Sequence, residues 1–341
     1  PHHPDLHFNG IPVAREDYTK HLGAYLDTRL NFSKHISEAV RKATKGLSLL
    51  KYLSKYVPRK ILDLSYKLYV RPHLDYGDVI YHNQREDLMN IVEQVQYKAG
   101  LIVTGCWQGT IRVKLYDELG WESLSDRRWG RRMSMYYKIV NGHTPAYLFE
   151  HVPSEAPRTL RKYVPKAPIT KTQRYANSFF PYCIKQWENL DSEIKFSTSV
   201  QTFKTKINEC IRPEPKFCCK RDKHGMRRLT QIRVDFSDLR DHRFNHKFHW
   251  PSPICSCGIE DETTTHFLLS CLRYDDLRQT YLSKISQITN SGVSILPKEH
   301  LTDLLLYGSK AYNDISNELI LTETILYIYK SERFKHLEAF S

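Results

Sequence analysis

The segment from Cys255 to Cys271 reads CSCGIEDETTTHFLLSC and places three cysteines and one histidine close together in the chain. A zinc ion binds four thiolate or imidazole ligands in a tetrahedron, commonly two from a tight turn and two from a following helix. Gly258 suits the turn, and the stretch from Thr263 to Ser270 has helical potential. We therefore predict one structural zinc ion with the ligands Cys255, Cys257, His266 and Cys271.

Two features leave the ligand set open. Paired cysteine ligands are more often separated by two residues than by one, so Cys218 or Cys219, which lie nearby in the chain, are alternatives to Cys255 or Cys257. A set of buried free cysteines is the alternative without a metal, because free cysteine packs as a small hydrophobic residue. The acidic run at 260–262 is expected to be solvated, so that this loop needs no core of its own.

The chain is strongly basic. It has 51 lysine and arginine residues against 38 aspartate and glutamate residues, a formal net charge of +13 over 341 residues. Such an excess favours a polyanionic partner, either nucleic acid or an acidic membrane surface; a soluble protein that is merely basic is the alternative. With 40% hydrophobic residues the chain can bury cores, and its length suggests two or three domains.

No stretch approaches the about 20 consecutive apolar residues that a membrane-spanning helix needs, so we expect no membrane partner. The first residues, PHHPDLHFNG, lack the apolar core of a secretory signal. We therefore expect an intracellular protein, in which clustered cysteines stay reduced and more often bind metal. Because the chain begins with Pro1 rather than methionine, we expect it to be a fragment.

The hydrophobic pattern predicts a short β region followed by helices. Residues 1–32 hold LHFNGIPV, with the turn dipeptide Asn9-Gly10, and HLGAYLD; we interpret these as a hairpin and a further short strand. From Ser33, an expected N-cap, apolar residues recur at three- and four-residue steps. We expect a helical domain at 33–152, with a break at Pro72 and a helix closed by Gly105.

Prolines and basic residues divide the remainder of the chain. We expect a linker and a small helical region at 153–211, with helices in SFFPYCIKQWENL and VQTFKTKINECI, then a basic and zinc-knuckle region at 212–275. C-terminal helices are expected at 276–341, one near 275–290 and the last from about Tyr312 to Leu337. The predicted fold class is mainly α, α+β overall, with a short β region at the N-terminus and a small zinc-knuckle-like module.

Three basic segments are candidates for nucleic acid binding. Residues 212–250 hold eleven lysines and arginines against five acidic residues, 158–174 hold six against none, and RRWGRR at 127–132 adds four. Cations that pair with phosphates, interleaved with rings that stack on bases, suit single-stranded nucleic acid. A solvated charged face is the alternative. The candidate contacts are Arg127, Arg128, Arg131, Arg132, Arg233, Arg240, Arg243, Phe244, Lys247, Phe248 and Trp250.

Together, these segments resemble the C-terminal part of the open reading frame of non-LTR (LINE) retrotransposons of the jockey-like kind. KHLGAYLDTRLNFSKHI at 20–36 resembles the segment after the polymerase palm, and LYVRPHLDYGDVIY at 68–81 resembles the thumb region. FFPYCIKQWENLDSEI and SVQTFKTKI are similar to the helical region downstream. RLTQIRVDFSDLRDHRFNHKFHWPSPICSCGIEDETTTHFLLSC is similar to the C-terminal zinc-knuckle region, where the cysteines and histidine are taken as metal ligands.

The resemblance implies part of a reverse transcriptase, with thumb helices that grip a primer–template duplex and a zinc-knuckle region that holds template RNA or target DNA. A nuclear location and no small-molecule substrate are implied as well. The alternative function is a free-standing zinc-dependent nucleic-acid-binding protein derived from such an element. A decayed copy without selected function is the third interpretation.

The polymerase signature of that family does not occur in this sequence. Its Tyr/Phe-x-Asp-Asp turn holds catalytic metal ions through two aspartates. Tyr274-Asp275-Asp276 lacks the spacer residue, and its aspartates are expected to favour the N-terminal end of a helix instead. No catalytic residue is assigned, and this part of the protein is expected to be inactive on its own.

Overall fold

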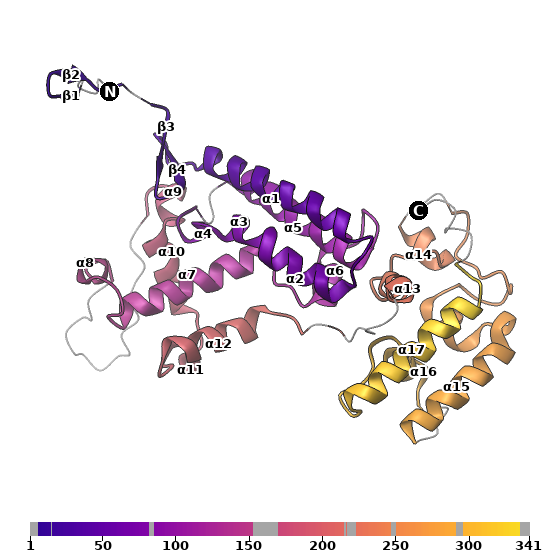
Figure 1. The fold of residues 1–341 in the computed structure, drawn as a ribbon. Coiled ribbons are helices and arrows are strands. Elements are labelled where there is room, and N and C mark those ends of the chain that lie inside the picture. Colours follow the sequence, from indigo (N-terminus) through magenta and orange to yellow (C-terminus); the bar gives the residue numbers. More distant parts are fainter. Residues whose placement is uncertain are drawn as a thin grey trace. The chain divides into compact units, whose positions relative to one another are not determined.

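The computed structural model describes most of the chain and divides it into two compact units. Unit 1 contains the described residues within Pro1–Ser48, Lys67–Gln96 and Ser123–Ile211, and unit 2 contains those within Leu49–Tyr66, Tyr97–Glu122 and Arg212–Ser341. The described residues are 6–14, 16–81, 85–152, 170–214, 216, 223–246, 250–290 and 296–334. They are mainly helical, with short antiparallel strands near the N-terminus (Figure 1), as the sequence predicts.

The first β element is the predicted hairpin. Strands β1 (His7–Phe8) and β2 (Ile11–Pro12) pair antiparallel around Asn9 and Gly10. Both turn residues have positive φ, 48° and 76°, which is the backbone that a tight two-residue hairpin requires.

The second β element differs from the prediction. HLGAYLD, residues 21–27, is predicted to be one strand. Instead, β3 (Tyr18–His21) ends at its first residue and β4 (Ala24–Asp27) forms its last four, and the two strands pair as a second hairpin. Leu22 and Gly23 make the turn with φ of 46° and 85°. A Cβ at Gly23 would lie 2.7 Å from the hydroxyl oxygen of Tyr76, so this turn needs glycine for space as well as for its backbone angles.

The helices of the 33–152 segment follow the predicted periodicity. The predicted apolar face of the first helix is buried at Ile36, Ala43 and Leu47. Ser33 is the first residue of that helix rather than its cap, and its hydroxyl donates to Oδ1 of Asn31 over 2.7 Å. The helices of this segment are α1 (Ser33–Leu53), α2 (Arg59–Tyr69), α3 (Arg71–Asp75), α4 (Asp78–Tyr81), α5 (Glu86–Thr104), α6 (Arg112–Leu119), α7 (Leu124–Val140) and α8 (Ala146–Phe149).

The two helix ends predicted in this segment are confirmed. The second helix stops before Pro72, which lies in the first turn of α3. Gly105 closes α5 with φ of 71°, and its N–H donates to the carbonyl of Leu101 over 2.8 Å.

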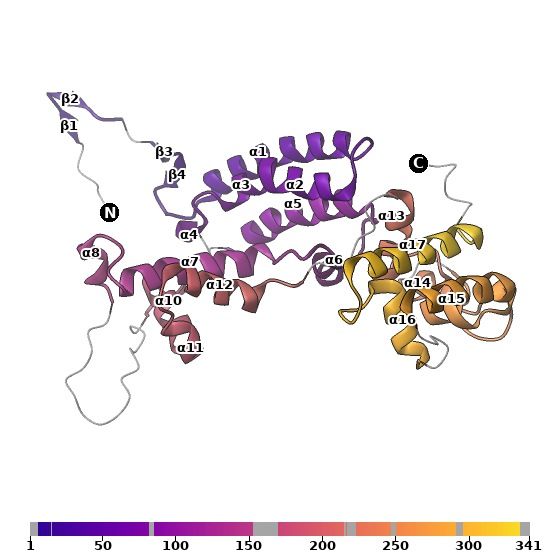
Figure 2. The same cartoon turned by 60° about the horizontal axis from the view of Figure 1, so that its bottom comes forward.

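The core of unit 1 forms around α7. Helices α10 (Phe179–Glu188) and α12 (Val200–Ile211) pack against it (Figure 2), near the short helices α9 (Gln173–Ala176) and α11 (Ser192–Lys195). The rings of Tyr137 and Phe203 stack with centroids 4.3 Å apart. Gly130 of α7 allows α12 to pack closely, because a Cβ at this position would lie 3.0 Å from side-chain atoms of Ile207 and Ile211.

The core of unit 2 is formed by its C-terminal helices (Figure 1). Helix α17 packs against α13, α15 and α16, and buried leucines, isoleucines and aromatic rings fill the space between them. The predicted helix near 275–290 is confirmed, whereas the last helix ends earlier than expected, at Lys330. The elements are α13 (Lys223–Arg233), α14 (Arg240–Asn245), η1 (His266–Ser270), η2 (Leu272–Tyr274), α15 (Asp275–Thr289), α16 (Lys298–Tyr307) and α17 (Asp314–Lys330).

A buried carboxylate joins four elements of unit 2. Oε1 of Glu118 on α6 accepts hydrogen bonds from Arg59 of α2 over 2.7 Å and from Arg233 of α13 over 3.0 Å. Arg233 also donates to the carbonyl of Leu306 on α16 over 2.6 Å. Burial alone would raise the pKa of Glu118, but the two guanidinium groups outweigh it and lower that pKa.

None of the helices in the described part of the chain combines the length and the apolar composition needed to cross a membrane.

We predict that Glu118→Gln destabilises unit 2 by about 3 kcal/mol, because it leaves two buried or half-buried arginines without their shared counter-charge. The same contribution should be lost in the wild-type protein as pH falls below about 4.5, because a carboxylate whose pKa is lowered by folding stabilises only while it is ionised. Hydrogen exchange of α6 and α13 in a urea series measures the change. Asp117→Asn, at the exposed neighbouring position, is the matched control and should change stability by less than about 0.5 kcal/mol.

Candidate metal centre and nucleic-acid interface

A tight loop positions the first two cysteines. Ile254 and Asp261 form a bridge across it, and Cys255 donates its backbone N–H to the carbonyl of Glu260 over 2.9 Å. Gly258 then donates to the carbonyl of Cys255 over 2.9 Å, with φ of 81°. This loop directs the side chains of Cys255 and Cys257 to the same side.

A wide helical turn positions the other two candidate ligands. His266–Ser270 winds as a π-helix, and Cys271 donates its backbone N–H to the carbonyl of His266 over 2.8 Å. This hydrogen bond spans five residues, one more than in an α-helix. The turn thus returns Cys271 to the side of the helix from which His266 projects.

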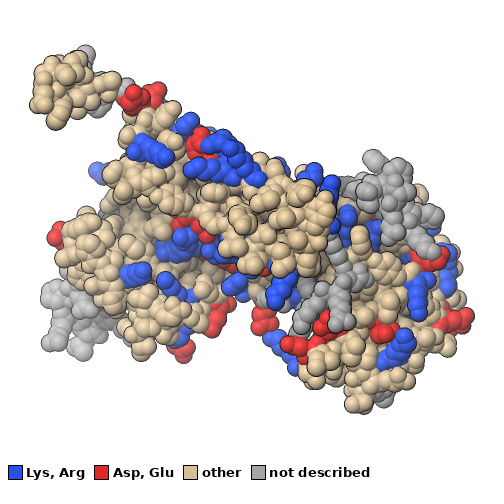
Figure 3. Space-filling view, viewed as in Figure 1, with Lys and Arg blue, Asp and Glu red and all other residues tan. Residues whose placement is uncertain are grey.

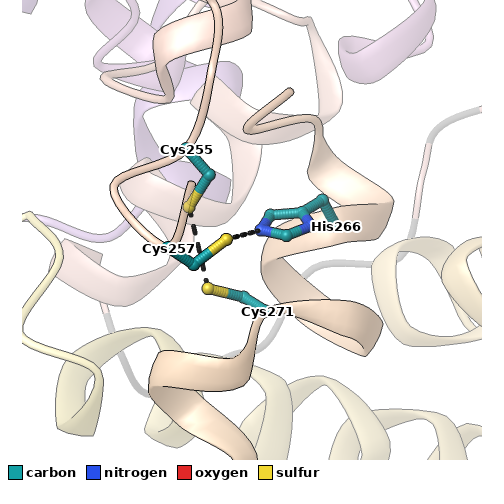
Figure 4. Close-up of side chains that lie close together, drawn as sticks. All are labelled: Cys255, Cys257, His266 and Cys271. Carbon is teal, nitrogen blue, oxygen red and sulfur yellow. Dashed lines mark hydrogen bonds between the residues drawn. The ribbon is translucent and has the colours of Figure 1, made fainter. Parts of the chain in front are cut away.

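The four side chains meet around one point (Figure 4). The sulfurs of Cys255 and Cys271 lie 3.7 Å apart, and the sulfur of Cys257 lies 3.4 Å from Nε2 of His266. All four candidate ligand atoms lie within 4.8 Å of one another. Tetrahedral zinc, with bonds of about 2.3 Å to sulfur and 2.0 Å to nitrogen, separates two sulfurs by about 3.8 Å and sulfur from nitrogen by about 3.5 Å. The cluster can therefore hold a metal ion and is compatible with zinc.

Glu260 orients the histidine and is a residue that the sequence analysis did not assign. Its Oε1 lies 2.6 Å from Nδ1 of His266, on the far side of the ring from the sulfurs. This hydrogen bond lowers the pKa of Glu260. A ring that donates from Nδ1 offers the lone pair of Nε2 to a metal, and such carboxylate partners are common behind histidine ligands. The sequence feature that could have identified Glu260 is its position as an acidic residue between the two pairs of candidate ligands.

The thiols differ in how easily they lose a proton. A hydrogen bond from the backbone N–H of Ile259 is the main cause that lowers the pKa of Cys257 to about 7. Burial raises the pKa of Cys271 to about 12. Because a metal ion binds thiolates, binding must displace the proton of Cys271, whereas Cys257 is partly ionised at neutral pH before any metal arrives.

Residues 254–271, which carry the four candidate ligands and are called the metal loop below, are anchored in the core of unit 2. This differs from the expectation that the loop needs no core. Phe267 and Leu268, directly after His266, are fully buried among the C-terminal helices. The acidic run is also not solvated throughout, because Glu262 is buried and accepts two hydrogen bonds of 2.6 Å from Arg333. The anchoring makes the candidate metal site part of unit 2.

The other described cysteines are not members of this cluster. Among the described residues, Cys255, Cys257, His266 and Cys271 form the one group of this kind that could hold a metal ion. Burial raises the pKa of Cys106 to about 11 and that of Cys183 to about 12. The alternative ligands Cys218 and Cys219 lie outside the described residues.

The arginines of RRWGRR occupy two different environments on α7. Arg127 and Arg131 are half-buried or exposed and pair with Asp75, at 2.9 and 3.3 Å. Arg128 and Arg132 are 2% and 0% exposed and lie over aromatic rings of their own unit. The structure thus places these last two in the interior, and we do not include them in a nucleic-acid interface.

Of the candidates in the basic 212–250 segment, Arg233 is buried with Glu118. Arg240 and Arg243 of α14 lie over the ring of Trp250, at 5.9 and 5.0 Å from its centroid. Phe244 is exposed. The structure thus brings Arg240, Arg243 and Trp250 together. The other two candidates, Lys247 and Phe248, lie outside the described residues.

The aspartates of Tyr274-Asp275-Asp276 begin helix α15, as predicted. Asp275 accepts a hydrogen bond of 2.6 Å from Arg278 one turn later. The pair therefore stabilises the N-terminal end of a helix and does not lie in a strand–turn–strand setting.

We predict that Glu260→Ala lowers metal affinity about 10- to 100-fold, because the ring of His266 loses the partner that fixes its orientation. Competition against a chromophoric chelator at neutral pH measures the affinity. Asp261→Ala, at the exposed adjacent position, is the matched control and should bind metal as the wild-type does. Equal affinity of the two variants would exclude this role of Glu260.

Sequence similarity relates this chain to one class of protein. It is 26% identical, over 173 residues, to the probable RNA-directed DNA polymerase from transposon X-element of Drosophila melanogaster. The match covers 50% of this chain and 19% of that relative. No protein-family model and no solved structure matches the chain. The similarity supports a region related to the reverse transcriptases of non-LTR retrotransposons.

Proposed function

We propose that this chain is the thumb and C-terminal nucleic-acid-binding region of a LINE-type, jockey-like RNA-directed DNA polymerase. The observation that carries the proposal is the similarity over half of the chain to the transposon polymerase. In this role the helical segment grips a primer–template duplex, and the metal-binding region holds template RNA or target DNA. Such a protein acts on DNA inside the cell, in the nucleus, without a small-molecule substrate at this region.

Exposed cations on α1 support the duplex contact. Lys42 and Lys45 are exposed and lie three residues apart on one face of the helix, whereas the neighbouring Arg41, also exposed, pairs with Glu38 at 2.8 Å. Figure 3 shows lysine and arginine side chains gathered along this helix. A row of cations suits the phosphates of a duplex.

The metal of this proposal is one zinc ion with a structural role. Cys255, Cys257, His266 and Cys271 fill all four tetrahedral positions, so no position remains for a reactive water molecule. Soft thiolate ligands together with one imidazole favour zinc over magnesium or calcium, which prefer oxygen ligands.

The second candidate function is a free-standing zinc-dependent nucleic-acid-binding protein derived from a retroelement. The metal cluster and the basic surface support it equally well. The coding sequence upstream of Pro1 separates the two functions: an in-frame Tyr/Phe-x-Asp-Asp motif favours the polymerase, and a start codon with its own promoter favours the free-standing protein.

We predict that the chain binds a primer–template duplex with an affinity that falls steeply with salt. Each phosphate contact contributes about −0.9 to the slope of log affinity against log salt for duplex DNA. Replacement of Lys42 and Lys45 by glutamine should therefore reduce the steepness by about 1.8, which fluorescence anisotropy over a salt series measures. Arg85→Gln, at an exposed arginine paired with Asp87, is the control and should leave the slope unchanged. An unchanged slope in the double variant would remove α1 from the interface.

We predict that zinc removal loosens unit 2 beyond the metal loop itself. Structural zinc contributes roughly 10–16 kcal/mol of apparent binding free energy in small modules, and Phe267 and Leu268 transmit its loss into the helical core. Hydrogen exchange after chelation should show lost protection in residues 250–275 and in α13 and α15. Helices α7 and α12 of unit 1 are the internal control and should stay protected. Substoichiometric zinc in protein prepared without chelator would contradict the proposed ion.

A further inference from the structure

A cleft beside the metal loop combines cations, an aromatic ring and carboxylates. It has a volume of about 1020 Å³ and lies entirely within unit 2, bordered by α14, the metal loop, η2 and the C-terminal end of α17. The size suits at least one nucleotide, since pockets for ligands of that size commonly enclose about 300–1,000 Å³. The lining residues that matter here are Arg240, Arg243, Trp250, Ser256, Arg273 and Lys330.

Two arginines of the cleft are held by neutral oxygen atoms rather than by carboxylates. Arg240 donates to the carbonyl of Ile254 over 3.0 Å, and Arg273 donates to the hydroxyl of Ser256. Among the described residues, neither guanidinium makes an ion pair with a carboxylate, so both can pair with an anion, although the charge of Arg240 also helps to lower the pKa of the nearby Glu262. Both acceptors belong to the metal loop, on either side of Cys255. The loop therefore fixes the positions of both cations.

The framework behind these arginines is rigid. Glu262 is buried, accepts the backbone N–H of Arg240 over 2.8 Å and pairs with Arg333 at 2.6 Å. Arg243 pairs with the buried Asp238, so its guanidinium is held where it lies over the ring of Trp250. Arg240 and Arg243 both contact the ring of Trp250, which is only partly buried. An aromatic ring that is partly exposed beside cations suits stacking on a base.

The carboxylates of the cleft affect which anion it can take. Asp276 and Glu332 are exposed and also line it. They disfavour a simple polyanion, but carboxylates accept hydrogen bonds from the amino groups of bases. A ligand that carries both phosphates and bases satisfies the whole lining, whereas polyphosphate satisfies only its cations.

We infer that this cleft binds a phosphate-and-base unit of a single-stranded nucleic acid, with Arg240 and Arg273 on the phosphates and Trp250 stacked on a base. The inference rests on the proposed nucleic-acid-binding function and deepens it, because it assigns the single-stranded site to a defined place. Arg273 is a contact outside the basic segments of the sequence. RNA and DNA share the chemistry that the cleft recognises.

The test separates the phosphate contact from the stacking contact. Fluorescein-labelled oligo(U) and oligo(dT) of equal length are titrated with the full chain over a salt series. Arg273→Gln should weaken binding and make the slope of log affinity against log salt less steep by about 0.7, the value for one phosphate of a single strand. Lys310→Gln removes one charge at a highly exposed lysine paired with Glu214 and should leave the slope unchanged.

Stacking should affect affinity without affecting the salt slope. Trp250→Leu should lower affinity about fivefold or more, whereas Trp250→Tyr should largely preserve it. Inorganic polyphosphate should bind the wild-type and Trp250→Leu proteins alike. Metal content and hydrogen exchange identify any variant that fails to fold. Because Arg273 is exposed, we expect Arg273→Gln to fold and to test the cleft even if a Trp250 variant does not.

The outcomes distinguish this inference from the proposed function. If the wild-type protein binds both oligonucleotides with a steep salt slope while Arg273→Gln and Lys310→Gln have the same slope, the cleft is not the site and the proposed function stands. Equal affinity of well-folded Trp250→Leu and wild-type proteins would likewise overturn the inference that the cleft is the binding site. If the wild-type protein binds neither nucleic acid, or binds with a flat salt dependence, the proposed function itself fails.

Discussion

The packing of Phe267 is the interaction on which the C-terminal unit depends. Its side chain is fully buried against the rings of Tyr274, Tyr327 and Phe334, and its carbonyl accepts a hydrogen bond of 2.6 Å from the hydroxyl of Tyr327. Because Phe267 directly follows His266, one helical turn carries both a candidate metal ligand and a central residue of the hydrophobic core. The metal cluster and the core therefore share the same backbone and stabilise each other.

The same unit shows how a basic protein uses part of its charge internally. Arg233 is buried against Glu118, and Arg333 lies against Glu262, which is also buried. In unit 1, Arg128 and Arg132 lie over aromatic rings in the interior. These arginines contribute to the net charge of +13 but offer little to a polyanion. The proposed interface thus depends on a smaller set of exposed cations on α1 and around the cleft beside the metal loop.

The features that were predictable from sequence are those with a local physical cause. The turn at Asn9-Gly10, the end of α5 at Gly105 and the aspartates that begin α15 each follow from the preferences of one or two residues. The meeting of the four cysteine and histidine ligand atoms followed from their spacing, although the one-residue spacer left other cysteines open. Local chemistry and chain spacing suffice for such features.

The features that were missed depend on the tertiary fold. Nothing local distinguishes Arg128 from Arg127, because only the packing around α7 decides which side of that helix is buried. HLGAYLD has the composition of a strand, and the turn at Leu22 and Gly23 divides it. Glu260 and Arg273 could not be assigned from spacing alone, since their roles depend on where the folded loop brings His266 and Ser256.

The wide turn at His266–Ser270 gives the chain an unequal tolerance of insertions and deletions around the metal cluster. Loss of one residue between His266 and Cys271 would convert the five-residue step into the four-residue step of an ordinary α-turn, which also returns the chain to the same side of the helix. The thiolate would keep its direction toward the cluster, and the change would fall on the side chains inside the turn, of which Phe267 and Leu268 are buried in the core. The loop around Gly258 tolerates less change in length, because the hydrogen bond from Gly258 to Cys255 and the bridge between Ile254 and Asp261 fix the positions of both cysteines.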